Sequence, residues 1–364
     1  MFIHRRPLGL VLSVLALFAT ACEEKKAPVV ENAPATTVDE AAPPAASEPA
    51  PEAKVASHPE CVGPRSDAPA ATFEAGGKSF ERKGSTLTMT TADADDELVI
   101  GQLSDIKDFT PENKANIDVA LKWFEQEKVD VIALTGDLGE SQANIELVLR
   151  HVAAKGLPVL AIAGNRECRD HFKKALDAVS GELKNVINMN EVRVFNTDDA
   201  SVVSMPGYYN RSYIHCADGC EYTPDDVAAL ESFAQDATAA ARVLIAHAPP
   251  KQNGEKGIDR IHEEVNVGDP KLAEVLGKGL FPFGLFGNIQ EAGGYATDLA
   301  GTNRVEQGQY VDALYLNPGP IDSVRWQMLD GSESLGMAGL LKVKGKQASY
   351  KVYRIKPGAA QVAK

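Results

Sequence analysis

Five short polar segments, each at the end of a predicted β-strand, constrain the fold of this chain more than any other feature. Gly-Asp and Gly-Asn pairs are routine in turns, so one such segment is uninformative. Their order, spacing and strand context together favour an α/β fold with a site on loops at the carboxyl ends of the strands. The segments are Ser104-Asp105-Ile106-Lys107, Gly136-Asp137-Leu138-Gly139-Glu140, Gly164-Asn165-Arg166-Glu167, Ala246-His247-Ala248-Pro249 and Gly287-Asn288-Ile289-Gln290.

The pattern between these segments alternates strand and helix early and is strand-rich late. Apolar runs predict strands, and Thr110-Pro111 and Thr223-Pro224 open helices with a capping threonine and a proline in the first turn. This succession fits two central sheets flanked by helices. Strands are expected over 97–103, 129–134, 158–163, 186–189, 192–196, 200–205, 242–246, 283–286, 313–316, 336–343 and 348–355, helices over 110–124, 142–154 and 171–179 and after 223, and a hairpin over 78–91.

In order and spacing the five segments resemble the calcineurin-like metallophosphoesterase series D-x-H, G-D, G-N-H-[DE], H and G-H-x-H. Asn317-Pro318-Gly319-Pro320 is similar to the N-P-G-[ST] segment that commonly follows. The resemblance implies an α/β/β/α sandwich. Four of the five motif histidines are absent, however, and their positions hold Lys107, Arg166, Asn288 and Gln290.

The resemblance also implies where two divalent metals would lie, with the Asp of G-D bridging them. Transferred residue by residue, it places Asp105, Lys107, Asp137 and Gln290 around the first metal. It places Asp137, Asn165, His247 and Asn288 around the second. Arg166 stands at the position that assists the leaving group, so Arg166 and Asp137 are the candidate catalytic residues.

Lys107 carries a positive charge at a position that, by the resemblance, should bind a metal cation. A protonated lysine has no lone pair to donate, so we hypothesise that its ammonium lies between Asp105 and Asp137 and replaces the first metal. We therefore expect no cofactor; the alternative is one weakly bound Mg, Ca or Mn held by the oxygen ligands that remain. Arg166 either binds an anionic group or forms an ion pair with Glu167, Glu140 or Asp170 that seals the pocket.

The amino terminus is typical of an exported lipoprotein. Residues 1–22 read as a signal peptide that ends in Ala19-Thr20-Ala21-Cys22, which resembles a lipobox with lipidation at Cys22. The alternative is ordinary cleavage after Ala21. Residues 23–71 are rich in Ala, Pro and Glu and are expected to form a disordered tether, or a cleavable propeptide. A domain over 72–357 and a flexible tail over 358–364 would follow.

The cysteine content and the net charge bear on the cellular compartment and on the partners of the protein. If Cys22 carries lipid, Cys61, Cys168, Cys216 and Cys220 remain, an even number that suits an oxidising compartment. Three pairings are open, and 216–220 with 61–168 is preferred. A net charge of −14 argues against nucleic acid as a partner.

These features predict a cell-envelope protein, with the outer membrane favoured and the domain in the periplasm or on the surface. Its expected role is a catalytically degenerate binding or scaffolding module for a phosphorylated ligand or an envelope protein. Two alternatives stay open. One is a divergent metal-dependent phosphoesterase acting on a phosphomonoester or phosphodiester. The other is a structural envelope protein whose pocket is vestigial.

Overall fold

The computed structural model describes residues 58–93 and 95–356. The predicted signal peptide, the lipidated Cys22, the tether up to residue 57 and the carboxyl-terminal tail lie outside the described residues. Within the described ranges, no helix has the length and apolar character to cross a bilayer. The expected tether boundary near Ala71 is too late, because Cys61 and Val62 are buried in the core and the Gly63 amide donates to the Asn190 carbonyl.

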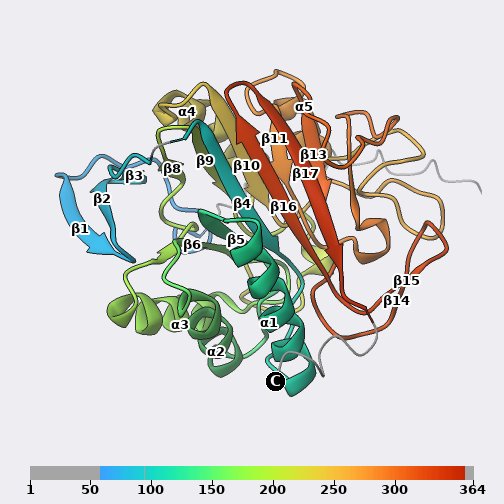
Figure 1. The fold of residues 1–364 in the computed structure, drawn as a ribbon, viewed down its shortest axis with the longest axis horizontal. Coiled ribbons are helices and arrows are strands. Elements are labelled where there is room, and N and C mark those ends of the chain that lie inside the picture. The colour runs from blue at the N-terminus through green and yellow to red at the C-terminus, as the bar shows by residue number, and fades with distance from the viewer. Residues whose placement is uncertain (1–57, 94, 357–364) are drawn as a thin grey trace, which may run out of the picture. The chain divides into compact units, whose positions relative to one another are not determined.

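Two β-sheets form the centre of the domain, as Figure 1 shows. The first has the order β17-β16-β4-β5-β6-β7, and β4 to β7 run parallel. Its strands are β4 (Glu97–Leu103), β5 (Val131–Thr135), β6 (Val159–Ile162), β7 (Val186–Asn188), β16 (Met337–Lys344) and β17 (Gln347–Arg354).

The second sheet has the order β1-β2-β3-β8-β9-β10-β11-β13-β12. Strands β9, β10, β11 and β13 are parallel to one another. The strands are β1 (Ala71–Ala75), β2 (Lys78–Lys83), β3 (Thr86–Met89), β8 (Val194–Asn196), β9 (Ala200–Met205), β10 (Ala241–Ala246), β11 (Phe283–Leu285), β12 (Tyr295–Thr297) and β13 (Leu314–Asn317). A separate hairpin pairs β14 (Trp326–Gln327) with β15 (Glu333–Ser334).

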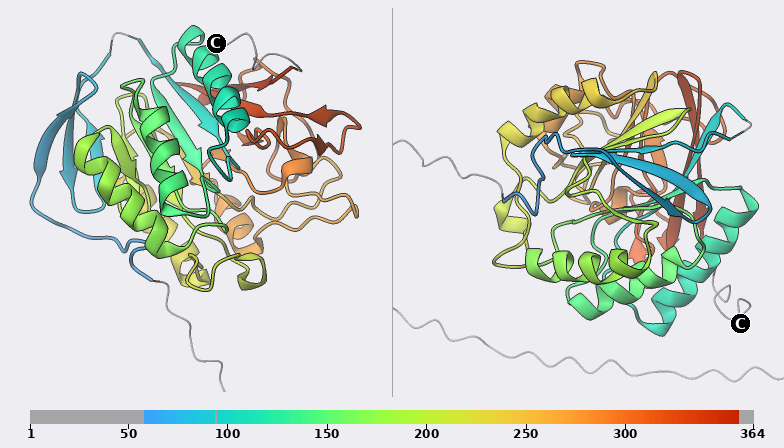
Figure 2. Two further views of the ribbon diagram at one scale, coloured as in Figure 1. Left: turned by 90° about the horizontal axis from the view of Figure 1, so that it is seen from below. Right: turned by 90° about the vertical axis from the view of Figure 1, so that its left-hand side faces the viewer.

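The helices cover the outer faces of the two sheets (Figure 2). On the side of the first sheet lie α1 (Pro111–Gln126), α2 (Gln142–Ala153) and α3 (Arg169–Glu182). On the side of the second lie α4 (Pro224–Asp236) and α5 (Pro270–Leu276). Two short 3₁₀ turns, η1 (Arg211–Tyr213) and η2 (Gln290–Ala292), follow β9 and β11.

Alternation along the strands explains this layering. Ile100, Val131 and Ile162 of the first sheet share one buried cluster with Val202, Val243 and Leu316 of the second, so these side chains fill the space between the sheets. Their neighbours, such as Leu103 and Leu134, point the other way and pack with the helices. Successive side chains on a strand face opposite sides, so strands buried on both faces read as continuous apolar runs. The predicted α/β/β/α sandwich is confirmed.

The disulfide pairing differs from the preferred one. Cys61 bonds to Cys220, and Cys168 bonds to Cys216. The prediction of 216–220 with 61–168 is wrong because it judged cysteines by their distance along the chain. The fold instead brings the loop after β9 against both the segment before β1 and the loop after β6.

Candidate functional site

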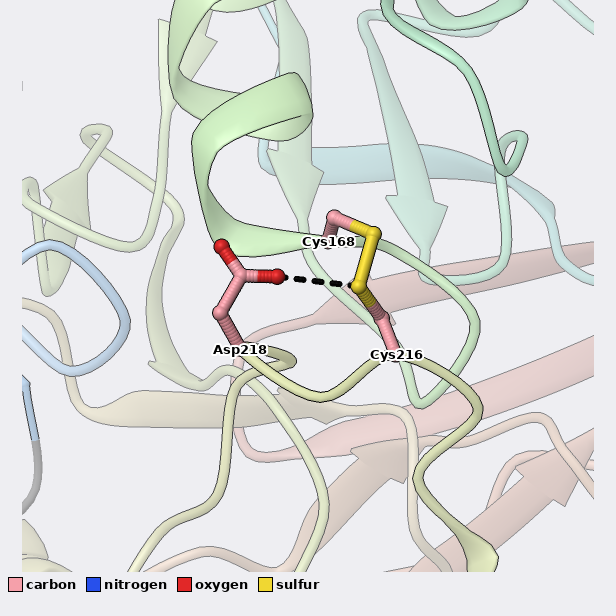
Figure 3. Close-up of side chains that lie close together, drawn as sticks. All are labelled: Cys168, Cys216 and Asp218. Carbon is pink, nitrogen blue, oxygen red and sulfur yellow. Dashed lines mark hydrogen bonds between the residues drawn. A yellow bond between two sulfur atoms is a disulfide. The ribbon is translucent and has the colours of Figure 1, made fainter.

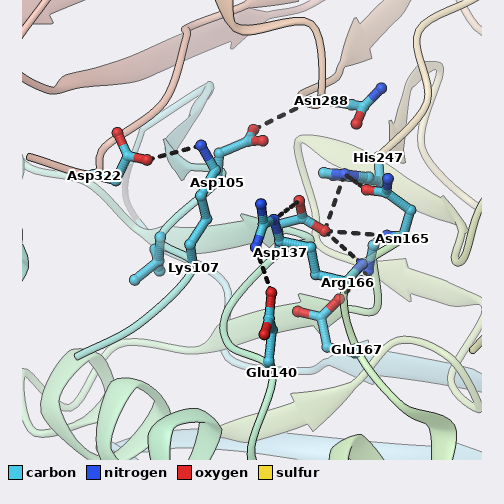
Figure 4. A network of polar contacts seen from close by, with 12 residues as sticks. Asp105, Lys107, Asp137, Glu140, Asn165, Arg166, Glu167, His247, Asn288 and Asp322 are labelled. Atoms are coloured by element: carbon cyan, nitrogen blue, oxygen red, sulfur yellow. Dashed lines mark hydrogen bonds and ion pairs between the residues drawn. The ribbon is translucent and has the colours of Figure 1, made fainter. Parts of the chain in front are cut away.

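The parallel strands deliver the five motif segments to one edge of the domain. Asp105 follows β4, Asp137 follows β5 and Asn165 follows β6 in the first sheet. His247 follows β10 and Asn288 follows β11 in the second. The predicted site is therefore assembled where the carboxyl ends of two sets of parallel strands meet (Figure 4).

Asp137 is the centre of this site and is 2% exposed. Its Oδ1 accepts hydrogen bonds from the backbone amides of Asn165 at 3.1 Å and Arg166 at 3.0 Å. His247 Nε2 lies 3.2 Å from the same oxygen. Burial opposes ionisation of Asp137, but His247, the Arg166 backbone amide and the Arg166 charge together hold the pKa of its carboxyl below the usual value.

Two glycines explain the G-D and G-N pairs. A Cβ at Gly164 would lie 2.4 Å from Asp137 Oδ1, and one at Gly136 would lie 2.6 Å from His247 Nδ1. Both positions must stay free of a side chain because the central carboxylate and imidazole pass directly over the backbone.

Asp105 is likewise buried and bonded to the protein. Its Oδ2 accepts from Ser104 Oγ at 2.7 Å and from the Asn288 amide at 3.1 Å, and its Oδ1 accepts from Gln290 Nε2 at 2.6 Å. Gln290 therefore presents its amide nitrogen to the carboxylate that would otherwise share a metal with it. A group that donates a hydrogen bond to a ligand oxygen competes with a metal for that oxygen.

Backbone strain marks the same loops. Asp105, Lys107, Asp137 and Asn288 have φ values of 54°, 66°, 58° and 62°. Only two other non-glycine residues in the described ranges, Lys128 and Glu264, share this left-handed region. Such conformations cost energy and concentrate at functional sites. Four of the six non-glycine residues with positive φ in the described ranges thus lie in the motif segments.

Lys107 does not lie between Asp105 and Asp137, so that hypothesis is wrong. Its Nζ bonds to Oδ2 of Asp322 at 2.8 Å and lies 4.3 Å from the centre of the Trp326 ring. Trp326 Nε1 in turn donates to Asp322 Oδ1 at 3.0 Å. The Lys107 side chain thus extends to the loop after β13, where its ammonium pairs with the 1% exposed carboxylate of Asp322.

Arg166 is the cation next to the central carboxylate. Its Nε lies 3.6 Å from Asp137 Oδ2, and its Nη1 forms an ion pair with Glu140 (Figure 4). Of the three ion-pair partners considered from the sequence, the structure therefore selects Glu140. Glu167 is instead fully buried and accepts the backbone amides of Leu138 and Gly164, which ties two motif loops together. Burial, together with the nearby Asp137 charge, raises the pKa of Glu167 to about 7.

His247 is fully buried between three acceptors. Its Nδ1 faces the Thr135 carbonyl at 2.8 Å, and its Nε2 faces Asn165 Oδ1 at 2.9 Å as well as Asp137. Burial disfavours the charged ring, but the Asp137 carboxylate outweighs it and raises the pKa of His247 to about 9. With acceptors at both nitrogens, an imidazolium suits this environment.

These contacts test how well the site fits metal ions. Asp105, Asp137 and His247 could each offer a ligand atom, and those atoms lie within 4.8 Å of one another. Both transferred ligand sets are incomplete. In the first, Lys107 is bonded to Asp322 and Gln290 donates to Asp105. In the second, Asn288 Nδ2 donates to Tyr208 Oη at 2.8 Å. The residues present do not fit a two-metal centre. Asp105, Asp137 and His247, with the Asn165 amide oxygen beside His247, fit at most a single ion.

A cavity of about 300 Å³ opens over the site. Several of its walls come from outside the motifs, on the loop after β9, the segment between β10 and α5, and the β14–β15 hairpin. Sequence reasoning missed these residues because they carry no motif. The lining residues outside the five segments are Tyr208, Tyr213, His215, Ile261, Val267, Glu291 and Trp326.

Both disulfides hold the loop that supplies the first three of these side chains. Cys168 directly follows the Gly-Asn-Arg-Glu segment and bonds to Cys216, next to His215 (Figure 3). Asp218 Oδ1 lies 2.9 Å from Cys216 Sγ. Cys220, four residues further on, is fixed to Cys61. The cavity wall is therefore covalently joined to the motif loop.

Comparison with known proteins agrees with this geometry. Residues 98–273 match the sequence model of the calcineurin-like phosphoesterase family. The chain therefore carries a calcineurin-like phosphoesterase domain. Among curated proteins, none matches this sequence.

Solved structures resemble this chain at low identity. TT1561 of Thermus thermophilus is 12% identical over 71% of this chain and 99% of its own, with a TM-score of 0.47. A second structure is 11% identical over 71% and 100%, with a TM-score of 0.50. A dimetal phosphatase from Danio rerio, LOC 393393, is 10% identical over 71% and 99%, with a TM-score of 0.44. Likeness at this level concerns the fold alone.

Proposed function

We propose that this chain is a catalytically inactive member of the phosphoesterase fold that works as a binding or scaffolding module in the cell envelope. One observation carries the proposal: protein donors and cations already occupy the carboxylates that would hold metals. Asp137 is bonded by two backbone amides and His247 and is flanked by Arg166. Asp105 accepts hydrogen bonds from the Ser104 hydroxyl, the Gln290 side-chain amide and the Asn288 backbone amide.

Two metals would supply the activated oxygen and the charge that phosphoryl transfer needs. The residues of this site supply neither the activated oxygen nor that positive charge. Arg166 and His247 neutralise Asp137, and the Lys107 ammonium is committed to Asp322. What the chain keeps is a preorganised cavity whose walls are fixed by strained loops and disulfides. Preorganised cavities bind without a large ordering cost, which supports a binding role.

The location is part of the same proposal. Lipidation of Cys22 would anchor the chain to a bacterial membrane, with the outer membrane favoured, and the Ala/Pro/Glu-rich tether would hold the domain away from it. The partner is then a ligand of the cavity or a protein of the envelope. Replacing Cys22 by Ser should move the protein from the membrane to the soluble envelope fraction; an unchanged membrane association would contradict the anchor.

Metal content and turnover test the inactivity. Protein purified without chelators should contain Mn, Fe and Zn far below one equivalent by elemental analysis. The protein should not hydrolyse an aryl phosphate when Mn is added. The background rate of hydrolysis should be the same for the wild type and for Asp137→Asn. Stoichiometric metal together with turnover that Asp137→Asn abolishes would instead establish the divergent phosphoesterase.

A further inference from the structure

We infer that the cavity over the degenerate site takes a small zwitterion with an apolar body, such as an apolar or aromatic α-amino acid. The inference rests on the proposed function, because metals at Asp105 and Asp137 would change the charge of the cavity floor. It narrows the ligand to a class that differs from a phosphate ester. The argument comes from the charge, the free polar atoms and the apolar walls of the cavity.

The charged groups that line the cavity are balanced. Lys107 and Arg166 are its lysine and arginine, and Asp137 and Glu291 are its carboxylates. Both cations also have carboxylate partners at the edge of the cavity, since Lys107 pairs with Asp322 and Arg166 with Glu140. A phosphate dianion would bring two more negative charges into a lining whose cations are already neutralised. A ligand with no net charge avoids that repulsion.

The free polar atoms include both donors and acceptors. Lys107 uses one of its three N–H groups on Asp322, and Arg166 Nη2 has no acceptor among the described residues. These N–H groups suit a ligand carboxylate. On the acceptor side, Asn288 Oδ1, Gln290 Oε1 and the Glu291 carboxylate receive no hydrogen bond from the described part of the chain. These oxygens suit a ligand ammonium.

The remaining walls are apolar or aromatic. Ile261, Val267, Tyr213 and Trp326 line the cavity, and Tyr213 is 59% exposed, which is the highest value among the exposed large hydrophobic residues described. The segments that carry them are held in place. Tyr209 Oη bonds to the Val267 carbonyl at 2.6 Å, and His262 Nε2 approaches the Gln327 carbonyl at 3.1 Å. A volume of about 300 Å³ lies at the small end of ligand sites, which suits one amino acid.

A matched ligand series tests this on the full-length protein. The probes are L-leucine, L-phenylalanine, phenethylamine, which lacks the carboxylate, 3-phenylpropionate, which lacks the ammonium, and phenyl phosphate. Isothermal titration calorimetry and thermal shift measure binding. We expect an amino acid to bind at least about tenfold more tightly than either half-ligand, since each charged hydrogen bond contributes on that order. Phenyl phosphate should bind no more tightly than 3-phenylpropionate.

Glu291→Gln identifies the ammonium site. It should weaken binding of the amino acid about tenfold while leaving 3-phenylpropionate unchanged. Glu274→Gln, an exposed carboxylate on α5 outside the cavity, is the matched control and should change neither. Retained binding of 3-phenylpropionate also shows that the variant is folded.

The outcomes separate the two proposals. Three results would overturn the zwitterion class: no binding of either amino acid, a half-ligand that binds as tightly as the amino acid, or tighter binding of phenyl phosphate than of 3-phenylpropionate. The inactive-module proposal would survive each of these results. Hydrolysis of the aryl phosphate with added Mn would overturn the inactive-module proposal, and the zwitterion class with it.

Discussion

The guanidinium of Arg166 lies beside the carboxylate of Asp137, with 3.6 Å between Nε and Oδ2. Arg166 follows Asn165 in the position where the family has a histidine, so the replacement exchanges a group that assists the leaving group for a fixed cation. Because its Nη1 also pairs with Glu140, the side chain is held across the loops after β5 and β6. A cation at this position repels a divalent ion from the central carboxylate.

Replacing Arg166 by Gln should therefore increase the affinity of the site for Mn. The variant removes the positive charge and leaves Asp105, Asp137 and His247 able to converge on an ion. We expect Kd for Mn to fall at least about tenfold, measured by calorimetry, since even a screened unit charge at this distance contributes more than about 1 kcal/mol. Arg150→Gln, which breaks a surface pair with Glu182, is the control. If both variants change the Kd for Mn equally, the Arg166 charge does not specifically weaken metal binding at this site.

The Lys107–Asp322 pair should contribute to folding. Asp322 is 1% exposed and Lys107 14%, so removing the ammonium leaves a buried carboxylate without its cation. We expect Lys107→Met to lower the free energy of unfolding by about 2–4 kcal/mol in urea denaturation. A double-mutant cycle with Asp322→Asn should give a coupling energy above about 1 kcal/mol.

The exposed pair Lys271–Glu274 on α5 provides the comparison for that cycle. Its coupling should stay below about 1 kcal/mol, as for surface pairs in general. Stronger coupling of Lys107 to Asp105 than to Asp322 would return Lys107 to the metal position that the sequence suggested.

Local signals predicted most of the fold. The strand over 97–103 and the one over 200–205 were placed correctly because each contains consecutive β-branched residues, Val99-Ile100 and Val202-Val203. Thr110 and Thr223 do cap α1 and α4, and Thr223 forms a capping box with Asp226. The strand β12 was missed because three residues carry too little periodicity to be recognised. The helix α5 was missed although Asp269 and Pro270 form the same kind of start signal, because only seven residues follow it.

The residues of the site were predictable, but their contacts were not. Motif order placed Asp105, Asp137, Asn165, His247 and Asn288 at one edge of the sheets. It could not show that the Lys107 ammonium would pair with Asp322. The two residues are more than two hundred positions apart, and their contact depends on the loop after β13. The cysteine pairing failed for the same reason. Long-range partners are set by the fold and not by separation along the chain.

The pairing itself can be checked and its strength measured. Proteolysis without reduction should release linked peptides that contain Cys168 with Cys216 and Cys61 with Cys220. Loss of the first bond in Cys168→Ser/Cys216→Ser should lower the free energy of unfolding by about 2–4 kcal/mol, because the bond closes a loop of 48 residues. A Cys216–Cys220 peptide would contradict the structure.

Stability should also depend on pH through Asp199. Burial and the neighbouring carboxylates of Asp198, Asp93 and Asp95 raise the pKa of Asp199 to about 6. A carboxyl that holds its proton more tightly in the folded than in the unfolded state favours folding at low pH. That contribution is lost as the pH rises from about 4, the value for an unfolded chain, to about 6. Asp199→Asn removes the ionisation, so its Tm should change less between pH 4 and pH 7 than that of the wild type, as followed by circular dichroism. Glu274→Gln should keep the wild-type dependence, and a steeper loss of Tm in Asp199→Asn would show that this carboxylate stabilises the fold when it is ionised.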